Sequence, residues 1–182
     1  MKNVVILNFS SRKGGNCAHA AEFISQHHLT DDVKTFTIDS INPCGGCDYE
    51  CLNPAAKCPN VSAYQEEVMH AVMHSDITYM IIPNFCGMPC ANFYAYNERS
   101  IGFFNMDRGV MGQYMNVKKR FVIISNTETV MFDQAMRQQT KEDPDVIYLK
   151  SGKYGKRSTA GDILESTHAQ ADLNGFLNGY TL

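Results

Sequence analysis

The chain has 182 residues, 44% of them apolar and 19% charged, which is enough apolar material for one compact hydrophobic core. Sixteen Lys and Arg stand against nineteen Asp and Glu, and the net charge of −3 argues against a nucleic-acid partner or an anionic membrane surface. The apolar run near the N-terminus, about six residues, is too short for a signal peptide or a membrane span. We therefore expect a single cytoplasmic domain over residues 1–182.

Short apolar runs alternate with segments of helical periodicity, a pattern typical of βα units over a parallel sheet. The expected strands are Val4–Phe9, Lys34–Ile38, Ile77–Ile82, Phe121–Ser125 and Val146–Leu149. Four of these runs are almost continuously apolar, whereas Lys34–Ile38 alternates apolar with polar residues and is expected at a sheet edge. This pattern favours a flavodoxin-like, three-layer α/β sandwich with a five-stranded parallel sheet of order 2-1-3-4-5.

Helices are expected between the strands, at Asn16–His28, after Ser62, within Cys90–Phe104, around Thr129–Gln139 and within Asp162–Leu177. Ser62 is followed three residues later by Gln65, the spacing of a capping box that begins a helix. The longest irregular segment is Ile41–Asn60, which holds four of the seven Cys. Irregular segments of that length inside compact domains are usually functional.

The first strand passes into the first helix through Ser10-Ser11-Arg12-Lys13-Gly14-Gly15-Asn16-Cys17. Two Gly let the backbone approach a ligand, the helix start supplies N–H groups and a positive dipole end, and the Ser hydroxyls and Arg12 add donors. The segment therefore predicts a phosphate site, with a plain Gly-rich turn capped by Asn16 as the alternative. It matches neither G-x-G-x-x-G nor the P-loop, so dinucleotide and ATP binding in those modes lack support.

Ligands of open α/β sheets bind at the carboxyl ends of the strands, beside the switch in strand order, which here lies between the first and third strands. The third strand ends in Pro83-Asn84-Phe85-Cys86-Gly87-Met88-Pro89, where a rigid Pro, an aromatic ring and a Gly can present backbone N–H groups to a planar ring. Asn126 and Thr127 follow the fourth strand and are expected to form a third, polar wall. Cys86 and Cys90 are interpreted as small apolar packing residues.

These loops resemble those of the NADPH-dependent FMN reductase family. The segment S-S-R-K-G-G-N-C is similar to that family's FMN phosphate loop, Asn84–Pro89 to its flavin-ring loop, and Asn97-Glu98-Arg99 to its acidic residue and Arg. Cys17 departs from the usual Ser or Thr, and Asn84-Phe85 from an apolar residue followed by Tyr or Trp. The resemblance covers roughly residues 3–150. It implies FMN bound by Ser10, Arg12, Gly15, Asn16, Cys17, Pro83, Asn84, Phe85, Cys86, Gly87, Asn126 and Thr127.

The resemblance further implies an oxidoreductase that takes hydride from NAD(P)H and reduces a quinone, flavin or similar small-molecule acceptor. No side chain need act as a nucleophile, because the cofactor carries the chemistry. A homodimer or homotetramer is implied as well, since a neighbouring subunit commonly completes the exposed flavin edge. The aromatic-rich stretch Phe93–Tyr114 is the expected contact surface.

Cys44, Cys47, Cys51 and Cys58 offer four thiolates within a short segment, a set that suits a tetrahedral zinc or a four-iron cluster. The segment resembles the Cys-rich loop of a branch that includes the iron-sulfur flavoproteins, but it has three residues between its second and third Cys where that branch has two. Three interpretations stay open. They are reduced thiols near the flavin, which we slightly prefer, an iron-sulfur flavoprotein that carries electrons, and a zinc-stapled, non-redox binding domain.

Overall fold

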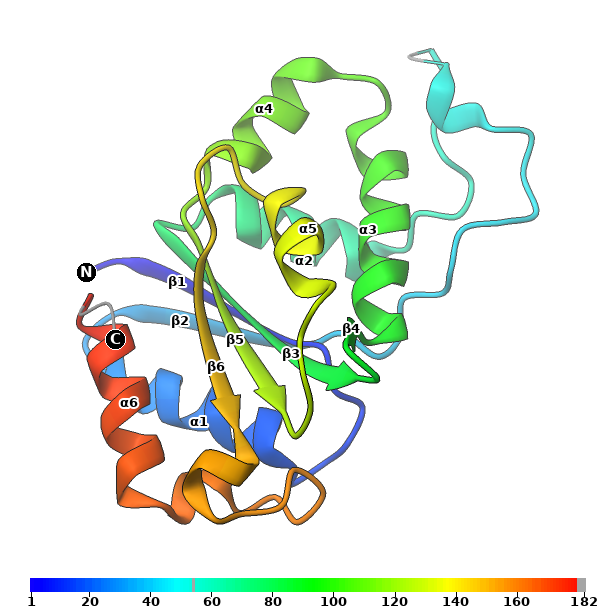
Figure 1. Cartoon of the computed structure of the whole chain (residues 1–182). Coiled ribbons are helices and arrows are strands. Elements are labelled where there is room, and N and C mark those ends of the chain that lie inside the picture. The colour runs from blue at the N-terminus through cyan, green and yellow to red at the C-terminus, as the bar shows by residue number, and fades with distance from the viewer. Residues whose placement is uncertain (54, 180–182) are drawn as a thin grey trace.

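A computed structural model of the chain describes residues 1–53 and 55–179. Five strands form a parallel sheet: β1 (Asn3–Asn8), β2 (Asp32–Thr37), β3 (Ile77–Phe85), β5 (Lys119–Ser125) and β6 (Asp145–Lys150). Their order is β2-β1-β3-β5-β6, and the two-residue strand β4 (Met88–Pro89) pairs antiparallel with β3 (Figure 1). Among the parallel strands this is the predicted order 2-1-3-4-5, and the predicted edge position of the second strand is confirmed.

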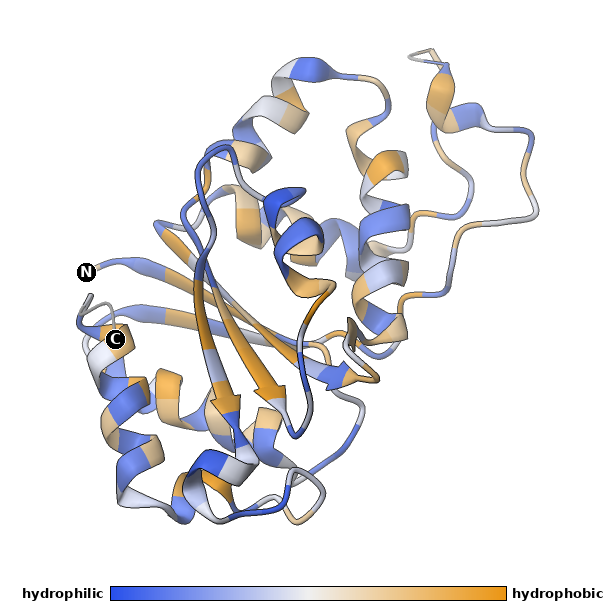
Figure 2. Ribbon diagram, viewed as in Figure 1, coloured by the Kyte–Doolittle hydropathy of each residue, from blue (hydrophilic) through white to orange (hydrophobic). Residues whose placement is uncertain are grey.

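Helices cover both faces of the sheet (Figure 1). One face carries α2 (Ala63–Met73), α3 (Ala91–Phe104), α4 (Arg108–Asn116) and α5 (Phe132–Arg137), and the other carries α1 (Asn16–His27) and α6 (Thr167–Leu177). Alternate strand residues point to opposite faces, so Val5 and Leu7 of β1 join the first core and Val4 and Ile6 the second. Hydrophobic residues accordingly run along the central strands (Figure 2).

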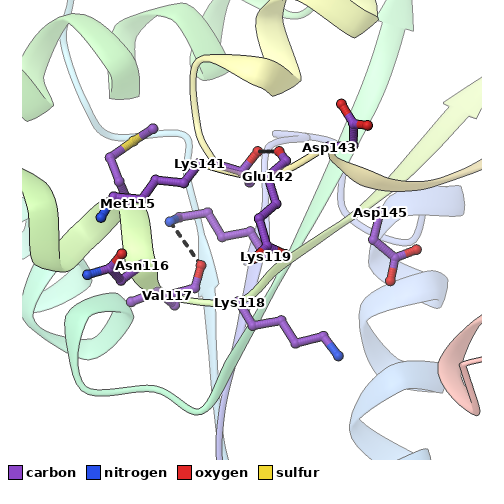
Figure 3. A pocket seen from close by; sticks show the side chains of 10 residues that line it. Met115, Asn116, Val117, Lys118, Lys119, Lys141, Glu142, Asp143 and Asp145 are labelled. Carbon is purple, nitrogen blue, oxygen red and sulfur yellow. Dashed lines mark hydrogen bonds between the residues drawn. The ribbon is translucent and has the colours of Figure 1, made fainter.

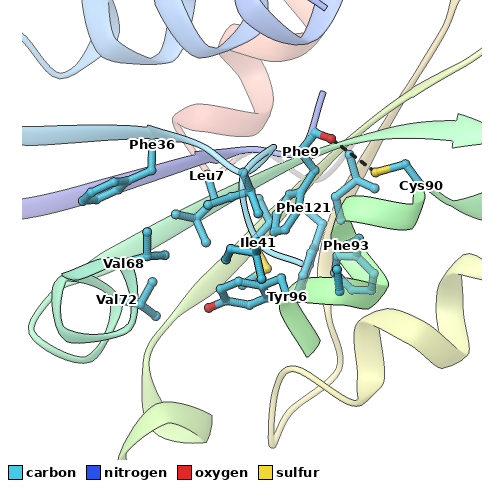
Figure 4. Packing of buried hydrophobic residues seen from close by; sticks show 14 of the residues in the cluster. Leu7, Phe9, Phe36, Ile41, Val68, Val72, Cys90, Phe93, Tyr96 and Phe121 are labelled. Carbon is cyan, nitrogen blue, oxygen red and sulfur yellow. Dashed lines mark hydrogen bonds between the residues drawn. The ribbon is translucent and has the colours of Figure 1, made fainter. Parts of the chain in front are cut away.

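In the core under α3, the ring of Phe9, the residue after β1, packs against aromatic rings of α3 (Figure 4). The ring of Phe9 meets the rings of Phe93 and Tyr96 edge to face, with centroids 5.4 and 5.5 Å away. Such pairs stabilise a core by about 0.5–1.5 kcal/mol beyond the apolar area that they bury. This packing holds the end of β1 against α3, and it therefore also positions the loop that follows β1.

The helices begin largely where the sequence predicts. The Ser62 hydroxyl accepts the Gln65 N–H (3.1 Å) and caps α2. Among the described residues, the Ser62 N–H does not donate back to the Gln65 side-chain oxygen, so only half of the capping box forms. Gln65 Nε2 is buried without a hydrogen-bond partner there. The sequence places Ala169, Leu173, Phe176, Leu177 and Tyr180 at a helical period near 3.6. The first four are buried, and Tyr180 lies outside the described residues.

One helix was not predicted. The α4 helix begins at Asp107, whose carboxylate accepts the N–H groups of Gly109 and Val110. Two glycines and a short apolar face hide its period in the sequence, although Asp107 is a good N-cap residue. Within the described residues, no helix combines the length and apolarity needed to cross a membrane.

Candidate functional site

The loop between β1 and α1 leads into α1, and no side chain caps the first turn of this helix. Gly15 is the N-cap of α1, it supplies no side-chain acceptor, and the first turn contains no acidic residue. By contrast, side chains cap α2, α4 and α6. The first N–H groups of α1 and its positive dipole end are therefore available to an anion. The alternative of an Asn16 cap is wrong, because Asn16 is already the first helical residue.

Arg12 lies across this helix start. A Cβ placed on Gly15 would lie 3.1 Å from Arg12 Cδ, and Gly14 has a left-handed φ of 64° that a side chain would strain. Gly14 is therefore needed for the left-handed turn, and Gly15 leaves room for the aliphatic part of the Arg12 side chain. Arg12 is exposed and forms no ion pair with any described residue, so its guanidinium is free to meet a ligand.

Asn16 has a role that the sequence does not reveal. Its amide donates to the Ser158 carbonyl (2.8 Å), and its carbonyl oxygen accepts the Ile163 N–H (2.9 Å). Gly161 in the same segment accepts a hydrogen bond from His19 Nδ1 (2.7 Å). Both polar groups of the Asn16 side chain are used inside the protein, so only its backbone N–H can serve a ligand. No local signal could show this, because the contacts join residues far apart in the chain.

Cys17 and Cys90 lie beneath the loop. Burial, reinforced by the neighbouring Cys90, raises the pKa of Cys17 to about 12, and burial also raises the pKa of Cys90. The Cys90 thiol donates to the Phe9 carbonyl (3.3 Å; Figure 4). Both are neutral packing thiols, as predicted for Cys90. Cys17 can offer a ligand only its backbone N–H, because its side chain belongs to the core.

The segment after β3 is a hairpin, where the sequence predicted a loop. Phe85 pairs with Met88, and the two residues between them, Cys86 and Gly87, have φ of 53° and 86°. Two left-handed residues in a two-residue turn define a type I′ hairpin. The Phe85 side chain is 62% exposed and Cys86 is exposed, so the interpretation of Cys86 as a packing residue is wrong.

Asn84 ties this hairpin to the end of β5. Its Nδ2 donates to Ser125 Oγ (2.7 Å), Thr127 Oγ1 (3.0 Å) and the Glu128 carbonyl (3.1 Å). Asn84 is only 8% exposed, and its Oδ1 has no partner among the described residues. The free group of the Asn84 side chain is therefore a hydrogen-bond acceptor. Pro83, the preceding residue, is half-buried within β3, and Asn126 is exposed beside Thr127.

A second asparagine joins the first loop to α3. Asn92 Nδ2 donates to the Phe9 carbonyl (3.1 Å) and to Ser11 Oγ (3.0 Å). The three predicted walls are thus linked by Asn92 on one side and by Asn84 on the other. Sequence reasoning missed Asn92. An open, largely apolar cavity of about 400 Å³ adjoins the walls, lined by Cys86, Gly87, Thr127, Glu128, Val130 and Met131.

In the Cys loop, Ile41–Asn60, three cysteines lie near the fourth, Cys51. Cys51 is buried, and burial is the main reason that its pKa is raised. The nearby thiols of Cys58, Cys44 and Cys47 raise it further. Among the described residues, no three His, Cys, Asp or Glu side chains are placed to hold a metal ion.

One face of α3 holds this Cys loop outside the sandwich (Figure 1). Arg99, 6% exposed, donates from Nε to the Asn42 carbonyl and from Nη2 to the Pro43 carbonyl, each at 2.8 Å. Glu98 accepts the Cys44 N–H (3.0 Å). Cys58 packs so closely on Gly102 that a Cβ there would lie 2.9 Å from its sulfur. The acidic residue and Arg that resemble the reductase family's pair are, in this chain, anchors of the Cys loop.

Comparison with known proteins identifies the fold. No protein-family model matches the chain, and no curated protein is similar to it in sequence. Among solved structures, the chain is similar to the Trp repressor binding protein from Bacillus subtilis (TM-score 0.64, 14% identity, 98% of this chain and 99% of that chain). An NADH:FMN oxidoreductase in its apo form is also similar (TM-score 0.59, 11% identity, 100% of this chain and 91% of that chain). So is a putative quinone reductase from Klebsiella pneumoniae (TM-score 0.61, 12% identity, 94% of this chain and 84% of that chain).

These likenesses, with the strand order, show that the chain has the flavodoxin-like fold. The names of the neighbours include flavin oxidoreductases and a quinone reductase, which sets the direction of the proposal that follows.

Proposed function

We propose that this protein is an FMN-dependent oxidoreductase that takes hydride from NAD(P)H and passes the electrons to a quinone, a flavin or a similar small-molecule acceptor. The observation that carries the proposal is the open start of α1, with Arg12 lying over Gly15, in a loop that Asn92 ties to the segment after the β3–β4 hairpin. Two linked features, an anion cradle and an apolar platform, match the two ends of FMN, a phosphate and a planar ring.

The residues present fit FMN. The phosphate would accept hydrogen bonds from the first N–H groups of α1, from the Ser10 hydroxyl and from Arg12, whose charge offsets the dianion. The unpartnered Asn84 Oδ1 is a suitable acceptor for a ring N–H, and the Cys86-Gly87 turn presents its backbone at the ring. Phe85, Asn126 and Thr127 complete the walls.

When bound, FMN would supply the redox chemistry, accepting hydride and releasing electrons, so the chain needs no nucleophile. The side chains position the reactants. The apolar cavity beside Cys86 and Met131 gives nicotinamide and acceptor one place to stack, so they would occupy it in turn. This arrangement predicts ping-pong kinetics.

The test is anaerobic mixing of the FMN-loaded protein with NADPH or NADH while the flavin absorbance is followed. We expect rapid bleaching with one nucleotide and reoxidation on addition of a quinone. A flavin that ignores both nucleotides would refute the proposal.

For the Cys loop we propose reduced thiols, with two alternatives. The grouping of three cysteines around Cys51 favours an iron-sulfur electron carrier as the second candidate, whereas the lack of a convergent metal-ready group among the described residues speaks for thiols. Iron, sulfide and zinc should be measured in protein purified without oxygen. About four irons per chain with matching sulfide would establish the cluster. Stoichiometric zinc would establish the zinc-stapled domain. Neither metal is the result that we expect.

We further propose a cytoplasmic homodimer or homotetramer. The expected contact stretch needs revision, because Phe93, Tyr96 and Tyr114 are buried in the protein's own core. Its exposed apolar side chains, Tyr94, Ile101, Met106 and Met111, lie on α3, on α4 and between them, and they form the revised contact surface. Sedimentation velocity that finds only a monomer at working concentration would contradict this proposal.

A further inference from the structure

A second cavity, of about 360 Å³, lies at the opposite end of the sheet from the proposed flavin site. Figure 3 shows the residues that line it. It is lined by residues 115–119, where α4 ends and β5 begins, and by residues 140–143 and 145, where β6 begins. The flavin site adjoins the carboxyl ends of the parallel strands, and this cavity adjoins their amino ends. The two sites are therefore separate.

Lys119 is the buried charge of this cavity. Its residue is 3% exposed, and its ammonium donates to the carbonyl oxygens of Tyr114 and Val117 and lies 4.0 Å from the Tyr114 ring centroid. No carboxylate among the described residues pairs with it. The two carbonyls take two of the three ammonium donors as a cap on the end of α4, and the third has no hydrogen-bond acceptor among the described residues. Burial without a counter-ion lowers the pKa of Lys119 to about 7.

The surrounding charges do not balance Lys119. Asp145 pairs with Arg120 (2.6 Å) and Asp143 pairs with Arg137, and neither arginine lines the cavity. Glu142 is then the one lining carboxylate without an ion pair in the described chain. Three lining lysines, Lys118, Lys119 and Lys141, also have no ion pair in the described chain. Because Lys118 points away from the other two (Figure 3), Lys119 and Lys141 are opposed by Glu142 alone, and the cavity carries an excess of positive charge.

Figure 3 shows how the lysines are arranged. The side chains of Lys119 and Lys141 extend toward the same side of the cavity, near Asn116, whereas Lys118 extends away. A ligand on that side would meet one buried and one flexible cation. The Asn116 amide, on an exposed residue at the end of α4, can add a donor.

We propose that this cavity binds a small dianionic oxyanion, with Lys119 as the central cation and Lys141 closing over the ligand. Both a phosphate monoester and a dicarboxylate have this chemistry. Binding would use the spare donor of Lys119, would supply the missing counter-charge and would connect the end of α4 to the start of β6. The cost of burying an unpaired ammonium is then recovered when the ligand binds.

The probe ions are inorganic phosphate and malonate, titrated into FMN-saturated protein so that the loop at α1 is occupied. If FMN does not bind, the Arg12→Ala variant replaces it, and the test stands without the proposed function. Chloride at matched ionic strength is the control salt. We expect a saturable rise in melting temperature and saturable calorimetric binding with at least one dianion but not with chloride. Phosphate binding alone indicates a phosphate monoester as the natural ligand, and preferred malonate binding indicates a dicarboxylate.

Three variants decide whether the cavity is the site. Lys119→Met should weaken binding about tenfold, and Lys141→Met about threefold, through lost charge-assisted hydrogen bonds. Lys34→Met, an exposed lysine of β2 at the other edge of the sheet, should bind like the parent. Lys141 is exposed, so Lys141→Met remains informative if Lys119→Met fails to fold. Parent-like affinity in Lys141→Met, or equal effects of dianions and chloride, would overturn the proposal.

Discussion

The loop at the start of α1 and the Cys loop beside α3 are both irregular segments rich in chemistry, and they are built in opposite ways. The first is short, its conformation is set by Gly14 and Gly15, and its donors are backbone N–H groups of the following helix. The second spans Ile41–Asn60, and helix side chains hold it from outside, with Arg99 and Glu98 bound to its backbone.

The difference teaches which kind of site a local motif can specify. A backbone cradle is fixed by residues next to one another in sequence, so its motif carries its geometry. Four cysteines on a loop specify only which ligands are available. Their arrangement depends on anchors such as Arg99 and Gly102, some fifty residues away. Local changes should therefore affect the first loop, and changes on α3 the second.

Arg99→Met should have the largest effect. The substitution removes two charge-assisted hydrogen bonds from the buried Arg99 side chain to the carbonyls of Asn42 and Pro43, which should cost about 2–4 kcal/mol in the free energy of unfolding. Loss of the unpartnered, buried Nη1 offsets part of this cost. Urea denaturation measures the change, and alkylation of Cys51 should become faster. Unchanged stability together with unchanged alkylation would mean that α3 does not hold the Cys loop.

Asn16→Ala should cost about 2–3 kcal/mol in unfolding free energy, because it leaves the Ser158 carbonyl and the Ile163 N–H unpaired beneath the loop. Asn126→Ala, an exposed asparagine of the same site, is the control and should change stability by about 0.5 kcal/mol or less. If Asn16 acts on the cofactor instead, Asn16→Ala would lower FMN affinity at unchanged stability, and its assignment as an internal staple would fail.

Arg12→Ala tests the cradle itself. It should weaken FMN binding by about 1.5–3 kcal/mol through lost charge-assisted hydrogen bonds, with unfolding free energy unchanged because Arg12 is exposed. Arg12→Lys keeps the charge but not the planar fork, so it should recover part of the affinity. Fluorescence titration of FMN measures both variants. Equal affinity in Arg12→Ala and the parent would place the phosphate elsewhere.

The strands were predictable because their burial on both faces of the sheet demands continuous apolar runs, as in Phe121–Ser125 of β5. The glycine-rich turn before α1 was predictable for the same kind of local reason, and its use as a phosphate site stays a prediction. The type I′ hairpin was not, since Cys86 occupies a left-handed position where Asn, Asp or Gly is usual. Contacts such as Asn16 with Ile163 and Asn92 with Ser11 join residues distant in the chain, and a single sequence holds no record of them.

The smallest effect, and the most specific one, is expected from Gly102→Ala on α3. An alanine stabilises a helix interior by about 1 kcal/mol relative to glycine, but here its Cβ would lie 2.9 Å from the Cys58 sulfur. The two contributions oppose each other, so the unfolding free energy should change by less than about 1 kcal/mol. Gly112→Ala on α4, where a Cβ would meet nothing within 4 Å, is the matched control and should gain the full increment.

The readout that separates these two glycines is the reactivity of Cys58. In Gly102→Ala the thiol must move off α3, so its alkylation should become faster, whereas Gly112→Ala should leave the rate unchanged. Equal alkylation rates and equal stabilisation in both variants would show that the Cys loop rests on α3 only loosely. Faster alkylation in Gly102→Ala alone would show that the Cys loop packs closely on α3 because residue 102 has no side chain there.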